Sequence, residues 1–257
     1  MAVDDPLDFA GRVVLVTGGG RGIGRSIAAR FAGAGATVVV CGRNEPDELS
    51  DGTAFIGCDV RDAEQVDAVV ASIAAEHGRL DVAVNNAGGA PFAEAATASP
   101  RFSEAIVRLN LLAPLHVAVA ANRVMQEQAD GGSIINIASV SGVRPSPGAA
   151  AYGAAKAGLL NLTQTLAVEW APKVRVNAVT AGLIRTEQSH LWYGDEAGIA
   201  AVGATVPLGR MGDGDDVAAA CLYLASPLAA YVSGANLLVH GGGEKPAYLD
   251  AANATHE

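Results

Sequence analysis

Short apolar runs alternate along the chain with longer amphipathic stretches. The runs are rich in β-branched residues and cover residues 13–17, 37–41, 54–57, 81–84, 133–137, 174–179 and 235–239. Apolar runs of this length, bounded by glycine or polar residues, predict strands that are buried on both faces. Because helical patterns separate them, the chain is expected to form an α/β fold with a parallel sheet.

The predicted helices lie between these runs. An amphipathic pattern at Ile27, Ala28, Phe31 and Ala32 predicts the first, and the others cover about 62–77, 100–128, 149–170 and 215–224. Asp62 suits the N-cap of its helix, because its carboxylate can accept the free N–H groups of the first turn. Asn110 stands in the middle of the longest helix, where asparagine is a mediocre helix former and, if buried, needs hydrogen-bond partners.

Two segments show no clean period. Residues 187–206 follow a strand end and are expected to form a lid or substrate loop, called the substrate segment below. Residues 244–257 form a C-terminal tail that is polar enough to be loosely held. No repeat or linker marks a second domain, so residues 1–257 are expected to form one domain with its core at about 9–243.

Composition narrows the class of protein. Half of the 257 residues are hydrophobic, which supports one large core, and 17% are charged. No run of 18 apolar residues lacks polar or glycine interruptions, and the acidic N-terminus has no secretion signal, so we expect a cytoplasmic protein without a membrane span. The formal net charge of −10 argues against a nucleic-acid partner.

The three cysteines are Cys41, Cys58 and Cys221. They are odd in number and widely spaced, with neither a CxxC pair nor a histidine cluster, so disulfide and zinc readings are both poor. We expect three small core residues and no metal site.

A glycine turn, Gly18–Gly24, follows the first strand and leads into an amphipathic helix. Glycines permit a tight turn and the close approach of a pyrophosphate, which the free N–H groups of the helix N-terminus can hold. A glycine-rich turn alone is weak support, but here a strand precedes it and a helix follows it. This context predicts a dinucleotide site.

The end of the second strand bears on the choice of dinucleotide. An NAD site would place Asp or Glu there to bind the ribose, whereas this chain has Gly42 and then Arg43. Arg43 and Arg21 together suit the 2′-phosphate of NADP, although each by itself could be a solvated loop arginine. Asp59, at the end of the third strand, can face the adenine amino group. The amides of Asn85 and Asn86 could either join strands or touch the cofactor.

Tyr152 and Lys156 lie four residues apart in a predicted helix and therefore share one face. A lysine charge near the phenol would lower the pKa of Tyr152 and make it a proton donor and acceptor. Ser139 follows the fifth strand, on the edge already given to the dinucleotide. On composition alone, Ser141 would serve as well.

With Thr17–Gly24, Asn85–Gly88, Asn110, Ser139 and the Tyr152–Lys156 pair in this order, the chain resembles the short-chain dehydrogenase/reductase family. The likeness is to its compact branch of 3-oxoacyl-thioester reductases and hydroxysteroid dehydrogenases. It runs from about residue 9 to 243. It implies a single doubly wound Rossmann domain with a seven-stranded parallel sheet in the order 3-2-1-4-5-6-7, which binds NAD(P)(H).

The resemblance also implies roles. Tyr152 would be the general acid/base, Lys156 would lower its pKa and hold the nicotinamide ribose, Ser139 would bind the substrate oxygen, and Asn110 would anchor a relay water. The expected cofactor contacts are Gly18, Gly20, Arg21, Gly22, Ile23, Gly24, Arg43, Asp59, Val60, Asn86, Gly88, Tyr152, Lys156, Ile184 and Thr186. The family's habit further implies a homotetramer.

Two positions depart from the family pattern. Ala181 replaces the proline commonly found after the sixth strand, beside the nicotinamide, and His240 replaces the aspartate of the last Val-Asp-Gly-Gly. Neither change touches the expected reacting groups.

The leading hypothesis is an NADP(H)-preferring oxidoreductase that interconverts a ketone and a secondary alcohol, with a 3-oxoacyl thioester or a steroid-like molecule as substrate. An NAD-dependent dehydrogenase is one alternative. A non-catalytic nucleotide-binding scaffold on the same fold is another.

Overall fold

A seven-stranded sheet runs through the centre of the protein, which is described here from a computed structural model covering residues 5–251. The strands are β1 (Val13–Thr17), β2 (Thr37–Gly42), β3 (Thr53–Gly57), β4 (Val82–Asn85), β5 (Gly132–Ser139), β6 (Val174–Ala181) and β7 (Asn236–Val239). All neighbours pair in parallel, in the order β3-β2-β1-β4-β5-β6-β7. The predicted fold class and strand order are confirmed.

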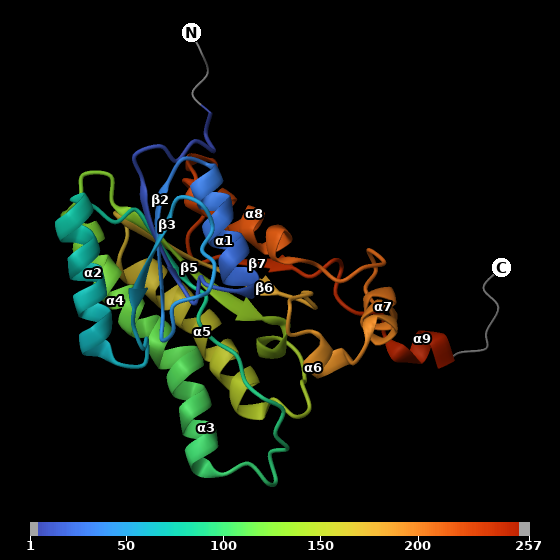
Figure 1. Ribbon diagram of the computed structural model, residues 1–257. Helices are drawn as coiled ribbons and strands as arrows, with labels where there is room; N and C mark the ends of the chain where they lie inside the picture. The colour runs from blue at the N-terminus through green and yellow to red at the C-terminus, as the bar shows by residue number, and fades with distance from the viewer. Residues whose placement is uncertain (1–4, 252–257) are drawn as a thin grey trace.

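Helices cover both faces of the sheet (Figure 1). One face carries α1 (Gly22–Gly33) and α8 (Gly214–Ala225), which pack against each other. The other carries α2 (Ala63–His77), α4 (Ala113–Glu127) and α5 (Ala150–Glu169). Each face has its own hydrophobic cluster, and all three cysteines are buried and free, as expected. Asp62 caps α2 by accepting the N–H groups of Glu64 and Gln65.

The longest predicted helix is three segments rather than one. It begins with α3 (Pro100–Val107), passes through the π-helical segment η1 (Arg108–Leu112) and continues as α4. Asn110 lies in η1, fully buried, and its Nδ2 donates to Ile106 O at 2.9 Å. In a π segment the backbone hydrogen bonds join residues five apart instead of four. The Asn110 side chain donates to the Ile106 carbonyl at this point.

Among the described residues, the helical run Pro100–Glu127 is long and apolar enough to cross a membrane by length and composition alone, and 44% of its apolar window is buried. A core helix meets the same criterion. In this structure α4 packs against β4, β5 and α2.

The substrate segment is more regular than expected. It contains α6 (His190–Tyr193) and α7 (Glu196–Ala204), and these lie beyond the sheet edge together with α9 (Ala247–Ala251) of the C-terminal tail (Figure 1). Gly194 separates α6 from α7 with a φ of 78°, and Asp195 caps α7. Residues 252–257 of the tail lie outside the described residues. Two short 3-10 turns, η2 (Val140–Gly142) and η3 (Pro227–Ala229), complete the elements.

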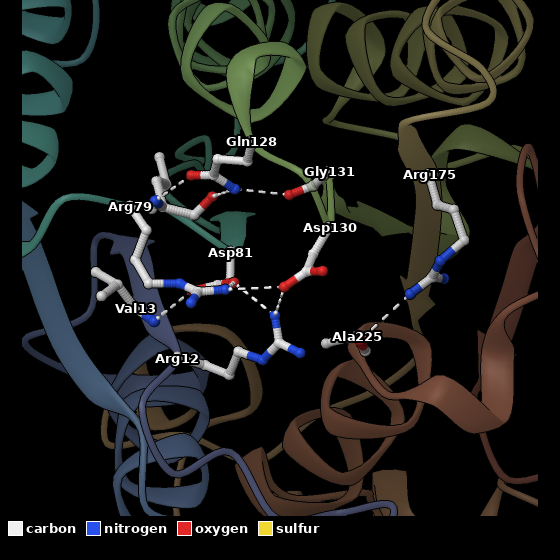
Figure 2. Close-up of polar contacts among 10 residues, drawn as sticks. Arg12, Val13, Arg79, Asp81, Gln128, Asp130, Gly131, Arg175 and Ala225 are labelled. Atoms are coloured by element: carbon white, nitrogen blue, oxygen red, sulfur yellow. Dashed lines mark hydrogen bonds and ion pairs between the residues drawn. The ribbon is translucent and has the colours of Figure 1, made fainter.

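A buried carboxylate joins strand starts at the amino edge of the sheet (Figure 2). Asp81, just before β4, accepts Arg12 Nη1 at 2.9 Å, Arg79 Nε at 2.8 Å and Val13 N at 2.8 Å. Burial by itself would raise the pKa of this carboxyl, but these hydrogen bonds outweigh it and the pKa lies below its usual value. Nearby, Gln128 bonds both Leu80 and the Gly131 carbonyl, which holds the start of β5.

We predict that Asp81→Asn lowers the free energy of unfolding at pH 7 by about 1–3 kcal/mol, because an amide replaces a carboxylate that accepts charged donors. Since the folded-state pKa is depressed, the carboxylate stabilises the fold above about pH 4, and this contribution is lost as pH falls further. Urea unfolding of both proteins from pH 3 to 7 measures this. A difference that does not shrink below pH 4 would contradict the assignment.

Candidate active site

The carboxyl edge of the sheet gathers the predicted motifs. Asn86 joins β4 to β1, because its Nδ2 donates to Thr17 O at 2.9 Å and Gly18 O at 3.1 Å. Asn85 is buried and donates to Asn136 Oδ1 at 2.9 Å, and Asn136 in turn donates to Thr163 of α5 at 2.9 Å. Both side chains therefore join elements around the sheet, and the contact of Asn86 with the cofactor stays a prediction.

The glycine turn packs too tightly for side chains at several positions. A Cβ atom at Gly24 would lie 2.3 Å from Gly18 O, and Gly18 and Gly22 have φ angles of 65° and 52°. The close contact and the positive φ angles require glycine at these positions, so they place no side chain over the backbone where α1 begins. The free N–H groups of a helix start suit a phosphate group, so the turn fits the diphosphate of a dinucleotide.

The loop after β2 folds back over this turn. A Cβ at Gly20 would lie 3.1 Å from the Pro46 side chain, so the loop that carries Arg43 adjoins the turn that carries Arg21. Both arginines are exposed, and neither side chain makes a hydrogen bond or ion pair with residues 5–251. Two guanidinium groups at neighbouring loops fit a phosphate monoester.

Asp59 has a partner that the sequence did not reveal. Arg61 holds its carboxylate with Nε–Oδ1 at 2.9 Å and Nη2–Oδ2 at 2.5 Å. This pairing lowers the pKa of Asp59 to about 2, and Arg43 adds to the effect. Val60, beside it, is buried. The carboxylate is therefore already bound on one side where the adenine was expected.

Gly88, Asn110 and Lys156 meet behind the loop that follows β4. Asn110 Oδ1 accepts Gly89 N at 2.9 Å, and its Nδ2 donates to Gly89 O at the same distance. A Cβ at Gly88 would lie 2.7 Å from Asn110 Oδ1 and 3.4 Å from Lys156 Nζ. The glycine thus leaves the room in which the amide and the ammonium approach each other.

Tyr152 and Lys156 lie in the first turns of α5, as predicted. Lys156 is 3% exposed, donates to Ile137 O at 2.7 Å and lies 5.7 Å from the centroid of the Tyr152 ring. Burial lowers the pKa of Lys156 to about 8. It raises the pKa of Tyr152, which hydrogen bonding with Ser139 opposes. The expected lowering of the phenol pKa by the lysine is therefore not found, because burial dominates both groups.

The structure distinguishes the two candidate serines. Ser139 ends β5, and its hydroxyl interacts with the Tyr152 phenol. The Ser141 hydroxyl instead accepts a hydrogen bond from Ser146 Oγ at 3.0 Å. Glycine at position 153 lets the turn approach α5 closely, since a Cβ there would lie only 2.7 Å from Ser141 O. Ser139 is therefore the serine beside the phenol.

Ile184 and Thr186 follow β6, next to the glycine turn, where Gly22 faces the Thr186 side chain. Glu187 was not predicted as a site residue; its Oε1 accepts Gly22 N at 3.3 Å and lies 3.7 Å from Arg25 Nη2. A carboxylate at a helix start is favourable, so an acidic residue opening the substrate segment was the available signal. Gly22, Thr186 and Glu187 border a cavity of about 420 Å³, which is also lined by Arg185, His190 and Asp213.

A smaller, largely apolar cavity of about 80 Å³ lies beside Tyr152. It is lined by Ala90, Pro91, Ala93, Ala95, Ala98, Phe102, Ser103, Ile106, Gly148, Ala149, Ala150 and Ala151 as well as by the tyrosine. Residues from three separate segments form it, so no local sequence motif predicts it. Within residues 5–251 no group of three or more potential metal ligands was found.

The two departures from the family pattern lie together. Ala181 is buried at the end of β6, and the Gly182 N–H bonds Val239 O at 2.9 Å. A Cβ at Gly182 would lie 2.6 Å from the His240 Cβ, so the histidine packs directly on this glycine.

Known proteins resemble the chain over most of its length. A family model described as Enoyl-(Acyl carrier protein) reductase matches residues 18–244. The D-threitol dehydrogenase of Mycolicibacterium smegmatis is 35% identical, with 94% of this chain and 96% of that protein covered. The Escherichia coli 3-oxoacyl-(acyl-carrier-protein) reductase FabG is 36% identical, with 92% and 98% covered.

A solved structure agrees with these relatives. Ligand-free aldohexose dehydrogenase (AldT) from Thermoplasma acidophilum superposes with a TM-score of 0.87 at 32% identity, covering 98% of each chain. The fold and relatives define an NAD(P)-dependent oxidoreductase. The chain belongs to the short-chain dehydrogenase/reductase family.

We predict that Gly88→Ala lowers kcat on the order of 100-fold, because the added methyl would displace the Asn110 amide and the Lys156 ammonium. Gly33→Ala is the matched control, since a Cβ there meets nothing within 4 Å. Turnover with NADPH and a ketone, together with the melting temperature, measures both. Wild-type turnover in a folded Gly88→Ala protein would contradict this account of the glycine.

Proposed function

We propose that the protein is an NADP(H)-preferring oxidoreductase that interconverts a ketone and a secondary alcohol. The observation that carries the proposal is the meeting of Ser139, Tyr152, Lys156 and Asn110 at the strand edge that also holds the glycine turn. These groups come from three elements: Ser139 from β5, Asn110 from η1, and Tyr152 with Lys156 from α5. Their convergence supplies a proton donor, an oxygen-binding hydroxyl and a route for the proton.

A bound nicotinamide supplies or accepts the hydride. The chain's own residues handle the proton and the oxygen. Tyr152 gives its proton to the oxygen of the reduced carbonyl, and Ser139 holds that oxygen by a second hydrogen bond. Lys156, with a pKa of about 8, can exchange a proton near neutral pH, and the Asn110 amide beside it is proposed to anchor a relay water.

The substrate is proposed to be a small carbonyl compound or alcohol. The E. coli relative is named for 3-oxoacyl reduction, while the others are named for threitol and aldohexose oxidation. A 3-oxoacyl thioester or steroid-like molecule stays the proposal for this chain, acted on by a cytoplasmic homotetramer. An NAD-dependent dehydrogenase and a non-catalytic scaffold are the alternatives that the experiments below test.

Tyr152→Phe removes the proton donor and keeps the ring. We predict that it lowers kcat by about 10²–10⁴-fold while NADPH still binds. Steady-state turnover and titration of nicotinamide fluorescence measure the two effects. Undiminished turnover would refute the role of Tyr152, and a wild-type protein that binds cofactor but turns over no ketone or alcohol would favour the scaffold.

Arg43→Asp tests the cofactor preference. We predict that wild type binds NADPH more tightly than NADH, and that the substitution weakens NADPH binding at least tenfold by removing a phosphate partner and adding repulsion. Arg101→Asp makes the same charge change on α3 and should leave both affinities as they are. Equal wild-type affinities for NADPH and NADH would favour the NAD-dependent alternative.

A further inference from the structure

Three consecutive glycines after β7 turn the chain back toward the active site. Gly241, Gly242 and Gly243 have φ angles of 63°, 94° and 88°, in the region that favours glycine. A Cβ at Gly241 would lie 2.6 Å from Val206, and one at Gly242 would lie 2.9 Å from Pro207. The turn therefore depends on glycine for both its conformation and its close packing, and it sets the position of Glu244.

Glu244 forms an ion pair with Arg144, a residue one hundred positions earlier in the chain. Arg144 belongs to the serine loop (residues 139–146), and both side chains are about one-third exposed, at 36% and 35%. The next residue of the tail, Lys245, donates its N–H to Thr205 O at 3.2 Å. The start of the C-terminal tail thus contacts the serine loop on one side and the substrate segment on the other.

Hydrogen bonds continue from this ion pair to the serine beside Tyr152. Arg144 Nη1 donates to Ser146 Oγ at 2.9 Å, and Ser146 Oγ donates to Ser141 Oγ at 3.0 Å. Ser141 N then donates to Ser139 Oγ at 3.2 Å. The serine expected to bind the substrate oxygen is therefore connected, contact by contact, to Glu244.

The ion pair also faces the substrate segment. Burial raises the pKa of Tyr193 on α6, the Glu244 charge raises it further, and Arg144 opposes this. Arg144 and Glu244 thus lie where three segments meet: the serine loop, α6 and the tail. Charge-assisted hydrogen bonds of this kind are stronger than neutral ones and fix the geometry of the groups that they join.

We propose that Arg144 and Glu244 are positioning residues for the reaction proposed above, on which this inference rests. Neither is expected to touch the reacting atoms. Together they hold the serine loop against the C-terminal tail, and so fix the direction of the Ser139 hydroxyl. They act on substrate turnover and leave cofactor binding unchanged, because the glycine turn lies on other segments.

A double-mutant cycle tests the pair: Arg144→Ala, Glu244→Ala and both together. Each single change should lower kcat/KM for the ketone about tenfold, with unchanged Kd for NADPH, and the double change should be no worse than either single one. Glu244→Gln keeps an acceptor and should recover part of the loss. Ser146→Ala leaves the ion pair but interrupts its connection to Ser141, and should lower kcat.

Arg123 and Asp67 provide a control cycle, since they form an exposed ion pair between α4 and α2. Their alanine variants should match wild type. Amide hydrogen exchange gives a readout that does not need activity: Glu244→Ala should speed exchange in residues 139–146. The inference would be overturned if the losses of the two single variants multiplied in the double variant. It would also be overturned if Glu244→Ala kept wild-type turnover and wild-type hydrogen exchange. An inactive wild type whose serine loop still loosens in Glu244→Ala would instead count against the proposed function.

Discussion

Every strand of the sheet runs in the same direction, and the arrangement of the active site follows from this constraint. Parallel pairing requires each strand to begin at one edge and end at the other, with a helix carrying the chain back. The carboxyl ends of β1, β4, β5 and β6 therefore meet at one edge, in the registers Val16 with Val84, Asn85 with Asn136 and Ser139 with Ala181. Parallel pairing therefore brings together groups that are far apart in the sequence.

The two edges have different physical tasks. At the amino edge, Asp81 and Gln128 satisfy backbone and arginine donors and join strand starts. At the carboxyl edge, glycines leave room beside the start of α1, where Glu187 accepts the Gly22 N–H. Between them, the buried amides of Asn85 and Asn136 connect β4, β5 and α5. The Nδ2 groups of both amides are paired, although Asn85 Oδ1 has no partner among the described residues. A buried donor is costly to leave unpaired, so these bonds help to fix the register of the elements that carry the chemistry.

The sequence predicted what local pattern controls. Strand positions, the glycine turn, the Asp62 cap and the Tyr152–Lys156 spacing depend on residues close together in the chain, and the structure places them as expected. The π segment at Asn110 was missed, because an interruption of one helical turn leaves almost no trace in hydrophobic periodicity. The contacts of Glu187 and Glu244 were missed for another reason: they join residues far apart in the sequence, and local patterns do not predict how loops fold against each other. Arg61 binds Asp59 only two residues away, but the spacing alone does not reveal that the two side chains point toward each other.

The pKa of Tyr152 also could not be predicted from sequence spacing, and it bears on the role of the phenol. Helical spacing correctly placed the ammonium near the phenol, but distance alone did not reveal how deeply both groups are buried. Burial favours the neutral form of each, which raises the pKa of Tyr152 and lowers that of Lys156 to about 8. A protonated phenol is the form that donates, so this shift suits the proton-donating role proposed for Tyr152 in carbonyl reduction. Alcohol oxidation would need the phenolate, which a protonated Lys156 would have to stabilise.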